Sequence, residues 1–169
     1  YGGGAQLYLA TLVLNGTSEV YENTGDVLGG GLYLYGSELS GGTVRQNIAD
    51  QGGGLYCESA YAITGTTVTG NSADTDGGGV YSNGTVGGSV SNVTLSLNSA
   101  GNEGGAFYAW QDSLLTLMNL SVVENSAGSL GAGLMLYGAD VVLETSFLRE
   151  NSAAVSGGGV YLEYTGLTV

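Results

Sequence analysis

Gly77-Gly78-Gly79-Val80-Tyr81 is the stretch that decides the fold, because it recurs along the whole chain. Three further copies keep both the glycine triplet and the tyrosine, and these are Gly29–Tyr33, Gly52–Tyr56 and Gly157–Tyr161. Weaker copies begin at Gly2, Gly104 and Gly131. Successive copies are offset by 27, 23, 25, 27, 27 and 26 residues. Self-similarity at a period of roughly 20–50 residues is the signature of a solenoid, in which each repeat packs on its neighbours.

The residues after each glycine triplet alternate like those of a half-buried β-strand. The first and third positions are apolar or small, so we expect them to face the interior. These inward columns are Ala5, Leu32, Leu55, Val80, Phe107, Leu134 and Val160, and Leu7, Leu34, Cys57, Ser82, Ala109, Leu136 and Leu162. The second and fourth positions carry most of the tyrosines, and we expect them to face outward.

Two further apolar stretches complete each repeat, for example Leu114–Leu117 followed by Leu120–Val123. Three short strands and three turns in about 25 residues leave no room for a helix-containing repeat. No long stretch carries the 3.6-residue apolar period of a helix either. The sequence therefore predicts an all-β protein, a parallel β-helix of about seven rungs. In this prediction residues 1–169 form a single β-helix domain. The domain is either a segment of a longer array of repeats or a unit that stacks with others to build such an array.

An asparagine follows the last apolar stretch in six repeats, and this column has two interpretations. The side chains either bind a ligand or donate hydrogen bonds from one rung to the next, as in asparagine ladders of stacked strands. The spacing of five or six residues to the following glycines favours the structural ladder. The predicted ladder comprises Asn23, Asn47, Asn71, Asn98, Asn125 and Asn151.

A Gly-Gly-Gly/Ala-apolar element paired with an apolar-x-x-Asn element resembles the repeats of right-handed parallel β-helix proteins. Within the pectin-lyase-like class, it is similar to the polymorphic outer-membrane protein and adhesin type. The likeness covers nearly the whole chain. It implies a right-handed coil, an architecture that serves adhesins, fibres and enzymes alike.

The charge of the chain excludes several kinds of partner. The sequence has 15 acidic and 2 basic residues, for a net charge of −13. Arg45 and Arg149 alone cannot form the basic patch that nucleic acid or an anionic membrane requires. Cys57 is the single cysteine, so no intrachain disulfide and no cysteine metal site are expected. No apolar run reaches the roughly 20 residues that span a bilayer, and we expect an extracellular or cell-surface location without membrane insertion.

Catalysis is not expected from this composition. A glycoside hydrolase needs two carboxylates roughly 5–10 Å apart. Asp74 and Asp76 are close but lie in a predicted turn, while Glu58 and Glu163 face outward four rungs apart. The two arginines lie in different rungs, where they cannot jointly neutralise a uronate for a lyase. The chain has no histidine to act as a base, and we expect no catalytic residue, no metal and no cofactor.

The expected outer face carries an aromatic stripe. A soluble monomer rarely leaves so large an apolar patch bare, and tyrosine and tryptophan suit interfaces. Tyrosine also has a high intrinsic β-propensity, which is the structural alternative. The predicted contact residues are Tyr33, Tyr35, Tyr56, Tyr81, Tyr108, Trp110, Tyr137 and Tyr161.

Four N-glycosylation sequons begin at Asn15, Asn83, Asn92 and Asn119. If the source is eukaryotic and the chain is secreted, glycans at these positions would line one edge of the solenoid.

Neither end of the array shows a polar cap in the sequence. Tyr1–Gly4 opens directly on a repeat, and Tyr161–Val169 ends within one. Either the array continues, or one copy stacks on the next by a contact that propagates into a filament. The sequence therefore predicts a structural subunit of an extracellular filament, glycosylated where the sequons are used, whose partners are copies of itself and glycans. The alternatives are an adhesin or carbohydrate-binding β-helix that uses the aromatic stripe, and a pectin-lyase-like hydrolase or lyase.

Overall fold

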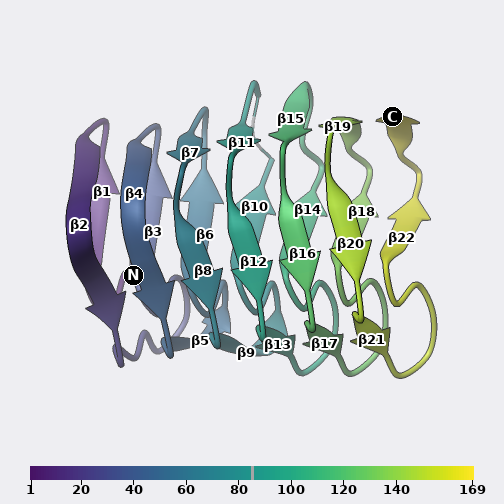
Figure 1. Ribbon diagram of the computed structural model, residues 1–169, viewed down its shortest axis with the longest axis horizontal. Coiled ribbons are helices and arrows are strands. Elements are labelled where there is room, and N and C mark those ends of the chain that lie inside the picture. The colour runs from purple at the N-terminus through teal and green to yellow at the C-terminus, as the bar shows by residue number, and fades with distance from the viewer. Residues whose placement is uncertain (85) are drawn as a thin grey trace.

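The computed structural model describes residues 1–84 and 86–169, which wind into a rod of stacked rungs (Figure 1). These residues form 23 strands and no helix, so none of them belongs to a helix that could cross a membrane. Strands of successive rungs pair in parallel and build three sheets along the rod. The prediction of an all-β parallel β-helix is confirmed.

Each sheet takes one side of the coil, and the third sheet is the shortest, with five strands. The first sheet holds the strand after each glycine triplet: β1 (Ala5–Tyr8), β3 (Leu32–Tyr35), β6 (Leu55–Glu58), β10 (Val80–Asn83), β14 (Phe107–Trp110), β18 (Leu134–Tyr137) and β22 (Val160–Glu163). The second sheet holds β2 (Thr11–Tyr21), β4 (Glu38–Arg45), β7 (Ala62–Thr64), β8 (Thr67–Thr69), β11 (Ser89–Ser91), β12 (Thr94–Ser96), β15 (Leu115–Met118), β16 (Ser121–Val123), β19 (Asp140–Glu144), β20 (Phe147–Arg149) and β23 (Gly166–Thr168). The third sheet holds β5 (Ile48–Gln51), β9 (Ser72–Asp76), β13 (Ser99–Ala100), β17 (Ser126–Ala127) and β21 (Ser152–Ala153). The seven strands of the first sheet delimit about six complete turns, against the seven predicted rungs.

The apolar core lies between the three sheets and contains the predicted inward columns except at the two ends, where Ala5 and Leu162 are exposed. Leu32, Leu55, Val80 and Phe107 stack in register and are each 0% exposed. Burying a side chain of this size contributes about 1.5–3 kcal/mol. Repetition of the same apolar columns in every rung therefore drives the coiling.

Close approach between rungs explains the second glycine of each triplet. A Cβ atom at Gly78 would lie 2.3 Å from the carbonyl oxygen of Ser99 and 2.5 Å from that of Gly105. The first glycine has another role, since Gly77 turns the chain with a φ of 68°, where side chains are disfavoured. The triplet is therefore structural, as its spacing predicts.

The sequence pattern does not predict the third sheet. Its central strands, β13 and β17, are two residues long and bury only Ala100 and Ala127. Two residues are too few to show the alternation of a strand. The predicted second and third strands are both present, for example as β15 and β16, and they lie in one sheet, which bends at Asn92 and Asn119 with φ of 55° and 53°.

Candidate functional site

Tyr33, Tyr56, Tyr81 and Tyr108 form a continuous stack on the outer side of the first sheet, here named the inner tyrosine ladder. Successive ring centroids are 5.6, 5.0 and 4.8 Å apart, and the rings are within 27° of parallel. The four side chains are only 4–7% exposed. Hydrophobic residues from the segments that precede the glycine triplets pack against them, among them Leu28 and Leu130. The ladder is a second apolar cluster, separate from the core.

The prediction of a bare aromatic contact surface is wrong at these four tyrosines. They do lie on the outer side of the sheet, but the chain before each glycine triplet folds back over them. A Cβ atom at Gly77 would lie 2.8 Å from the Cβ atom of Tyr81, so this turn lies directly against the ring column. The other four predicted contact residues are half-buried, and these are Tyr35, Trp110, Tyr137 and Tyr161.

The fourth strand position forms an outer aromatic column beside the ladder. Its members in register are Tyr8, Tyr35, Glu58, Asn83, Trp110, Tyr137 and Glu163. Tyr8 and Tyr35 stack at 4.8 Å, and Trp110 and Tyr137 stack at 4.5 Å. Stacking of rings on one another occupies the ring faces. Each stacked ring therefore has one face occupied by its partner, while Tyr8 at the N-terminal end of the column remains 64% exposed.

Hydrogen bonding and burial keep the ladder hydroxyls protonated. The Tyr33 hydroxyl donates to the carboxylate of Glu58. Burial, and next the charge of nearby Glu58, raises the pKa of Tyr56 to about 12. Burial likewise raises the pKa of Tyr81 and Tyr108 above the ordinary value. None of these tyrosines is poised to act as a base near neutral pH.

Asp76 and Glu103 form a carboxylate pair beside the ladder that the sequence analysis did not identify. They occupy equivalent positions one rung apart, and Asp76 Oδ1 accepts hydrogen bonds from Asn102 Nδ2 at 3.0 Å and from the Glu103 backbone N at 3.1 Å. Burial raises the pKa of both carboxyls, and the charge of Asp76 adds to the effect on Glu103. Asp76 and Glu103 each directly precede a copy of the glycine element in successive repeats, and this spacing could have predicted from the sequence that they lie side by side.

The six predicted ladder asparagines hydrogen-bond from rung to rung. Asn47, Asn71, Asn98 and Asn125 are at most 1% exposed. Each ladder asparagine up to Asn125 donates from its backbone N and its Nδ2 to the Oδ1 of the next, at 2.9–3.1 Å. The Nδ2 atoms from Asn47 onward also donate to a backbone carbonyl of the preceding rung. The amides are occupied in holding rungs together, which leaves them unavailable to a ligand.

The sequon asparagines lie away from this ladder. Asn15, Asn92 and Asn119 are exposed, whereas Asn83 is half-buried and its sequon residue Thr85 lies outside the described residues. Asn119 Nδ2 donates to Asn92 Oδ1 at 2.7 Å across adjacent rungs. Glycosylation at the four positions stays a prediction.

The carboxylates considered for hydrolysis are not brought together. Glu58 and Glu163 lie on β6 and β22, four strands apart in the first sheet, or about 19 Å at the usual ~4.8 Å between strands. Asp74 is exposed, whereas Asp76 is half-buried against the ladder.

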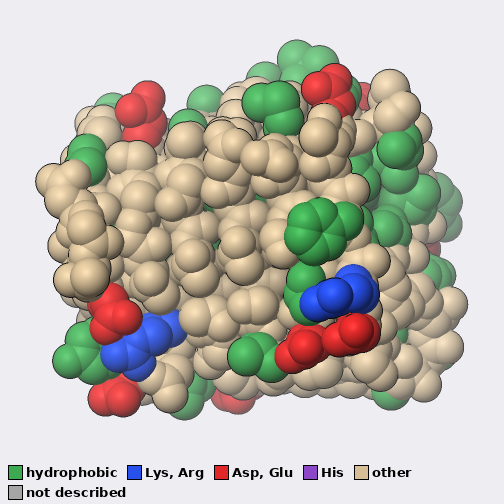
Figure 2. All heavy atoms as spheres, in the orientation of Figure 1, with side chains coloured by type: hydrophobic (Ala, Val, Ile, Leu, Met, Phe, Trp, Pro, Cys, Tyr) green, Lys and Arg blue, Asp and Glu red, His purple; other side chains and the backbone are tan. Residues whose placement is uncertain are grey.

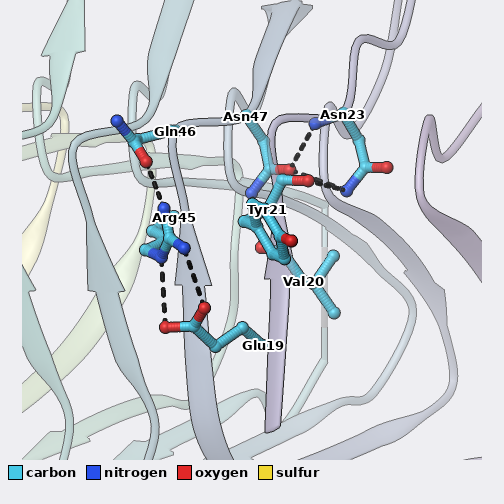
Figure 3. A network of polar contacts seen from close by, with 7 residues as sticks. All are labelled: Glu19, Val20, Tyr21, Asn23, Arg45, Gln46 and Asn47. Carbon is cyan, nitrogen blue, oxygen red and sulfur yellow. Dashed lines mark hydrogen bonds and ion pairs between the residues drawn. The ribbon is translucent and has the colours of Figure 1, made fainter.

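The two arginines lie in one column of the second sheet. From one strand to the next, the residues in register in this column are Arg45, Thr69, Ser96, Val123 and Arg149, so the two arginines lie four strands apart. Arg45 donates to both carboxylate oxygens of Glu19, at 2.8 and 3.1 Å, and also to Gln46 (Figure 3). Its guanidinium carbon lies 4.4 Å from the centre of the Tyr21 ring. This network forms at the rim of the N-terminal rung, beside the start of the asparagine ladder (Figure 3).

The core reaches the surface at both ends of the rod. At the N-terminal end, a hollow of about 420 Å³ is lined by the buried Leu32 and by apolar residues of the first rung, among them Ala5, Leu12 and Val20. At the other end, Leu162 of the inward column is 44% exposed. Each end therefore presents apolar surface and the edge of a sheet.

Comparisons with known proteins identify one related repeat. Searches of curated proteins and of solved structures return no significant match. Residues 65–83 match the model of the Chlamydia polymorphic membrane protein (Chlamydia_PMP) repeat. The matched segment runs from β8 through Asn71 and the glycine triplet to β10. It therefore contains both elements of the predicted repeat, and the resemblance to polymorphic membrane protein repeats is confirmed.

Proposed function

We propose that this chain is a structural, non-catalytic rod of a surface protein, and that its copies join head to tail into a filament. The polymorphic membrane protein repeat and the β-solenoid fit a surface repeat protein of the adhesin type. The apolar ends support the stacking step. Bare sheet edges invite pairing with further strands, and stacking of unlike ends generates an open-ended assembly.

The observation that carries this proposal is the apolar surface at both ends of the rod, and the asparagine ladder adds a direction to it. Asn125 donates from its backbone N and its Nδ2 to Asn151 Oδ1, at 3.0 and 2.9 Å. The rung that begins with β22 has no ladder asparagine, so with β1 of the next copy on β22 the Asn23 of that copy would lie two rungs from Asn151. The ladder therefore gives the rod a direction, with its donors pointing toward the C-terminal end, but it would not continue by a direct bond across the junction.

The core columns also match across such a junction. Placing β1 of one copy on β22 of another aligns Ala5 with Val160 and Leu7 with Leu162, all on the interior side. The junction would bury Leu162, and the N-terminal hollow would be filled by apolar side chains. Removal of this apolar surface from water favours association.

Two variants with one blocked end each test the proposal. Leu162→Lys places a charge in the core of the last rung, and Leu12→Lys places one at the N-terminal hollow. A charge buried without a partner costs several kcal/mol, so we expect each variant to be monomeric where the unmodified chain forms filaments. Because each retains one intact end, mixing them should give a dimer of twice the 16.9 kDa chain mass. Light scattering after gel filtration and electron microscopy provide the measurements.

Ser91→Lys is the matched control, since it adds the same charge to the half-buried outer side of β11, away from the ends. We expect this variant to form filaments like the unmodified chain. An unmodified chain that stays monomeric at millimolar concentration would exclude head-to-tail assembly. Dimers in either variant alone would show an isologous contact instead.

A further inference from the structure

A shallow hollow lies on the outer side of the second sheet, away from both aromatic columns. Its volume is about 230 Å³. It forms where the sheet bends between β11 and β12 and between β15 and β16, next to β20. The lining residues are Asn92, Val93, Thr94, Asn119, Leu120, Ser121 and Phe147.

The polar side chains of the hollow retain hydrogen-bonding capacity. Asn119 Nδ2 donates one bond to Asn92 Oδ1, and an amide group can form up to four bonds. The backbone beneath is already paired, since Ser121 N donates to the Val93 carbonyl and Phe147 N to the Leu120 carbonyl, both at 3.0 Å. In the chain without glycans at Asn92 and Asn119, these amides, together with the hydroxyls of Thr94 and Ser121, are therefore the groups that a ligand would meet.

The two asparagines are not needed for the bend itself. Gly65 turns the same corner in another rung with a φ of 63°, and a Cβ atom there would meet nothing within 4 Å. Thr145 turns it in a third rung with a φ of 49°. Asparagine tolerates this conformation, but the backbone does not require its amide.

Phe147 provides an aromatic ring that the ladders do not cover. Its side chain is 57% exposed, in contrast to the buried rings of the inner tyrosine ladder. Its neighbour in register is Ser121, with Thr94 one rung further. Two small hydroxyl side chains leave the ring free on the side of the hollow.

The face on one side of the hollow carries no charge, whereas β19 and β20 on its other side contain Asp140, Glu144 and Arg149. The strands β8, β11, β12, β15 and β16 contain no charged residue, although the chain has a net charge of −13. Figure 2 shows a broad uncharged area in the middle of this face, with two mixed acidic and basic groups in its lower part and further acidic side chains along its upper edge. The hollow thus suits an uncharged ligand.

We propose that this hollow binds one neutral pyranose ring of a glycan. The C–H face of the sugar would pack on Phe147, and its hydroxyls would exchange hydrogen bonds with the amides and hydroxyls described above. Ligand pockets usually enclose roughly 300–1,000 Å³, so the smaller hollow accommodates a single ring with the rest of the glycan outside. The site gives the proposed surface protein a ligand, but its geometry does not depend on filament formation.

Titration with methyl glycosides of glucose, galactose, mannose and N-acetylglucosamine tests the site. We expect one of these to bind with millimolar affinity and to shift the amide NMR signals of Thr94, Ser121 and Phe147. Phe147→Leu keeps an apolar side chain but removes the ring, and should weaken binding about tenfold, as loss of one aromatic contact does. Asn119→Gly removes an amide while retaining the backbone conformation, and should weaken binding as well.

Tyr8→Leu is the matched control, because it removes a different exposed ring on the first sheet. Tyr8 belongs to the outer aromatic column and is 64% exposed. This substitution should leave the affinity unchanged. Circular dichroism of each variant checks that the fold is retained. Absence of any shift with all four glycosides overturns the proposal, as does equal binding by Phe147→Leu and the unmodified chain. Filament formation is scored separately by electron microscopy, so either proposal can fail alone.

Discussion

The side chain of Asn98 shows why an asparagine occupies this position in six rungs. Its Nδ2 donates to the Val68 carbonyl at 3.0 Å and to Asn125 Oδ1 at 3.1 Å. Its Oδ1 accepts from the backbone N and the Nδ2 of Asn71, both at 3.0 Å. An aspartate could not donate, and a leucine could do neither. Only a side-chain amide of this length satisfies all of these buried groups.

We predict that Asn98→Ala lowers the free energy of unfolding by about 2–6 kcal/mol, because it orphans two buried groups at about 1–3 kcal/mol each. These are the Asn71 backbone N–H and the Val68 carbonyl. Urea unfolding followed by circular dichroism measures the change. The control is Asn15→Ala, an exposed site, where we expect a change within about 0.5 kcal/mol. Similar losses in both variants would contradict the structural role of the ladder.

The inner tyrosine ladder acts as a structural element that spans several rungs. Tyr81 stacks between Tyr56 at 5.0 Å and Tyr108 at 4.8 Å, and is 7% exposed. Aromatic pairs contribute about 0.5–1.5 kcal/mol beyond the area that they bury. The ladder thus links four rungs on the outside of the first sheet, in parallel with the core inside.

We predict that Tyr81→Ala destabilises the protein by about 3–5 kcal/mol, the usual cost of removing a buried ring. Tyr81→Phe keeps the ring and should cost less than about 1 kcal/mol, the net value of a typical hydrogen bond. Tyr8→Ala removes a ring that is 64% exposed, and should cost less than Tyr81→Ala. Urea unfolding midpoints of the three variants provide the comparison. Equal effects of Tyr81→Ala and Tyr8→Ala would show that the ladder is not a buried element.

At the scale of the whole molecule, stacking of rungs also aligns like charges. Glu103 lies one rung from Asp76, and both pKa values are raised, first by burial. The folded state thus disfavours the charged carboxylates. This penalty is fully present above the raised pKa values. It disappears as the pH falls to the unfolded-state values of 3.8 for Asp and 4.5 for Glu.

We predict that Glu103→Gln raises the thermal unfolding midpoint at neutral pH, because it removes the charge that burial and Asp76 disfavour. The advantage over the unmodified chain should vanish below the unfolded-state pKa of 4.5. Glu144→Gln, which removes the same charge from an exposed side chain, serves as the control and should change the midpoint less. Calorimetry across this pH range measures all three proteins. A lower midpoint for Glu103→Gln at neutral pH would contradict the assignment.

The sequence by itself determined the coil, its period, the inward columns and the asparagine column. Each of these depends on a local pattern repeated once per rung: glycines where the chain turns, apolar residues at alternate positions, and an asparagine at the same corner of six rungs. Stacking equivalent positions then requires no further information, because parallel rungs place like residues on like.

Only the tertiary structure decided what covers the outside of the coil. The path of the segments before the glycine triplets buries Tyr81 and its neighbours, although their alternation correctly placed them on the outer side. The pairing of Asp76 with Glu103 and the hollow beside Phe147 likewise depend on contacts between rungs. A periodic pattern specifies which side of a strand a residue occupies. Whether that side is bare or covered depends on turns that carry no such pattern.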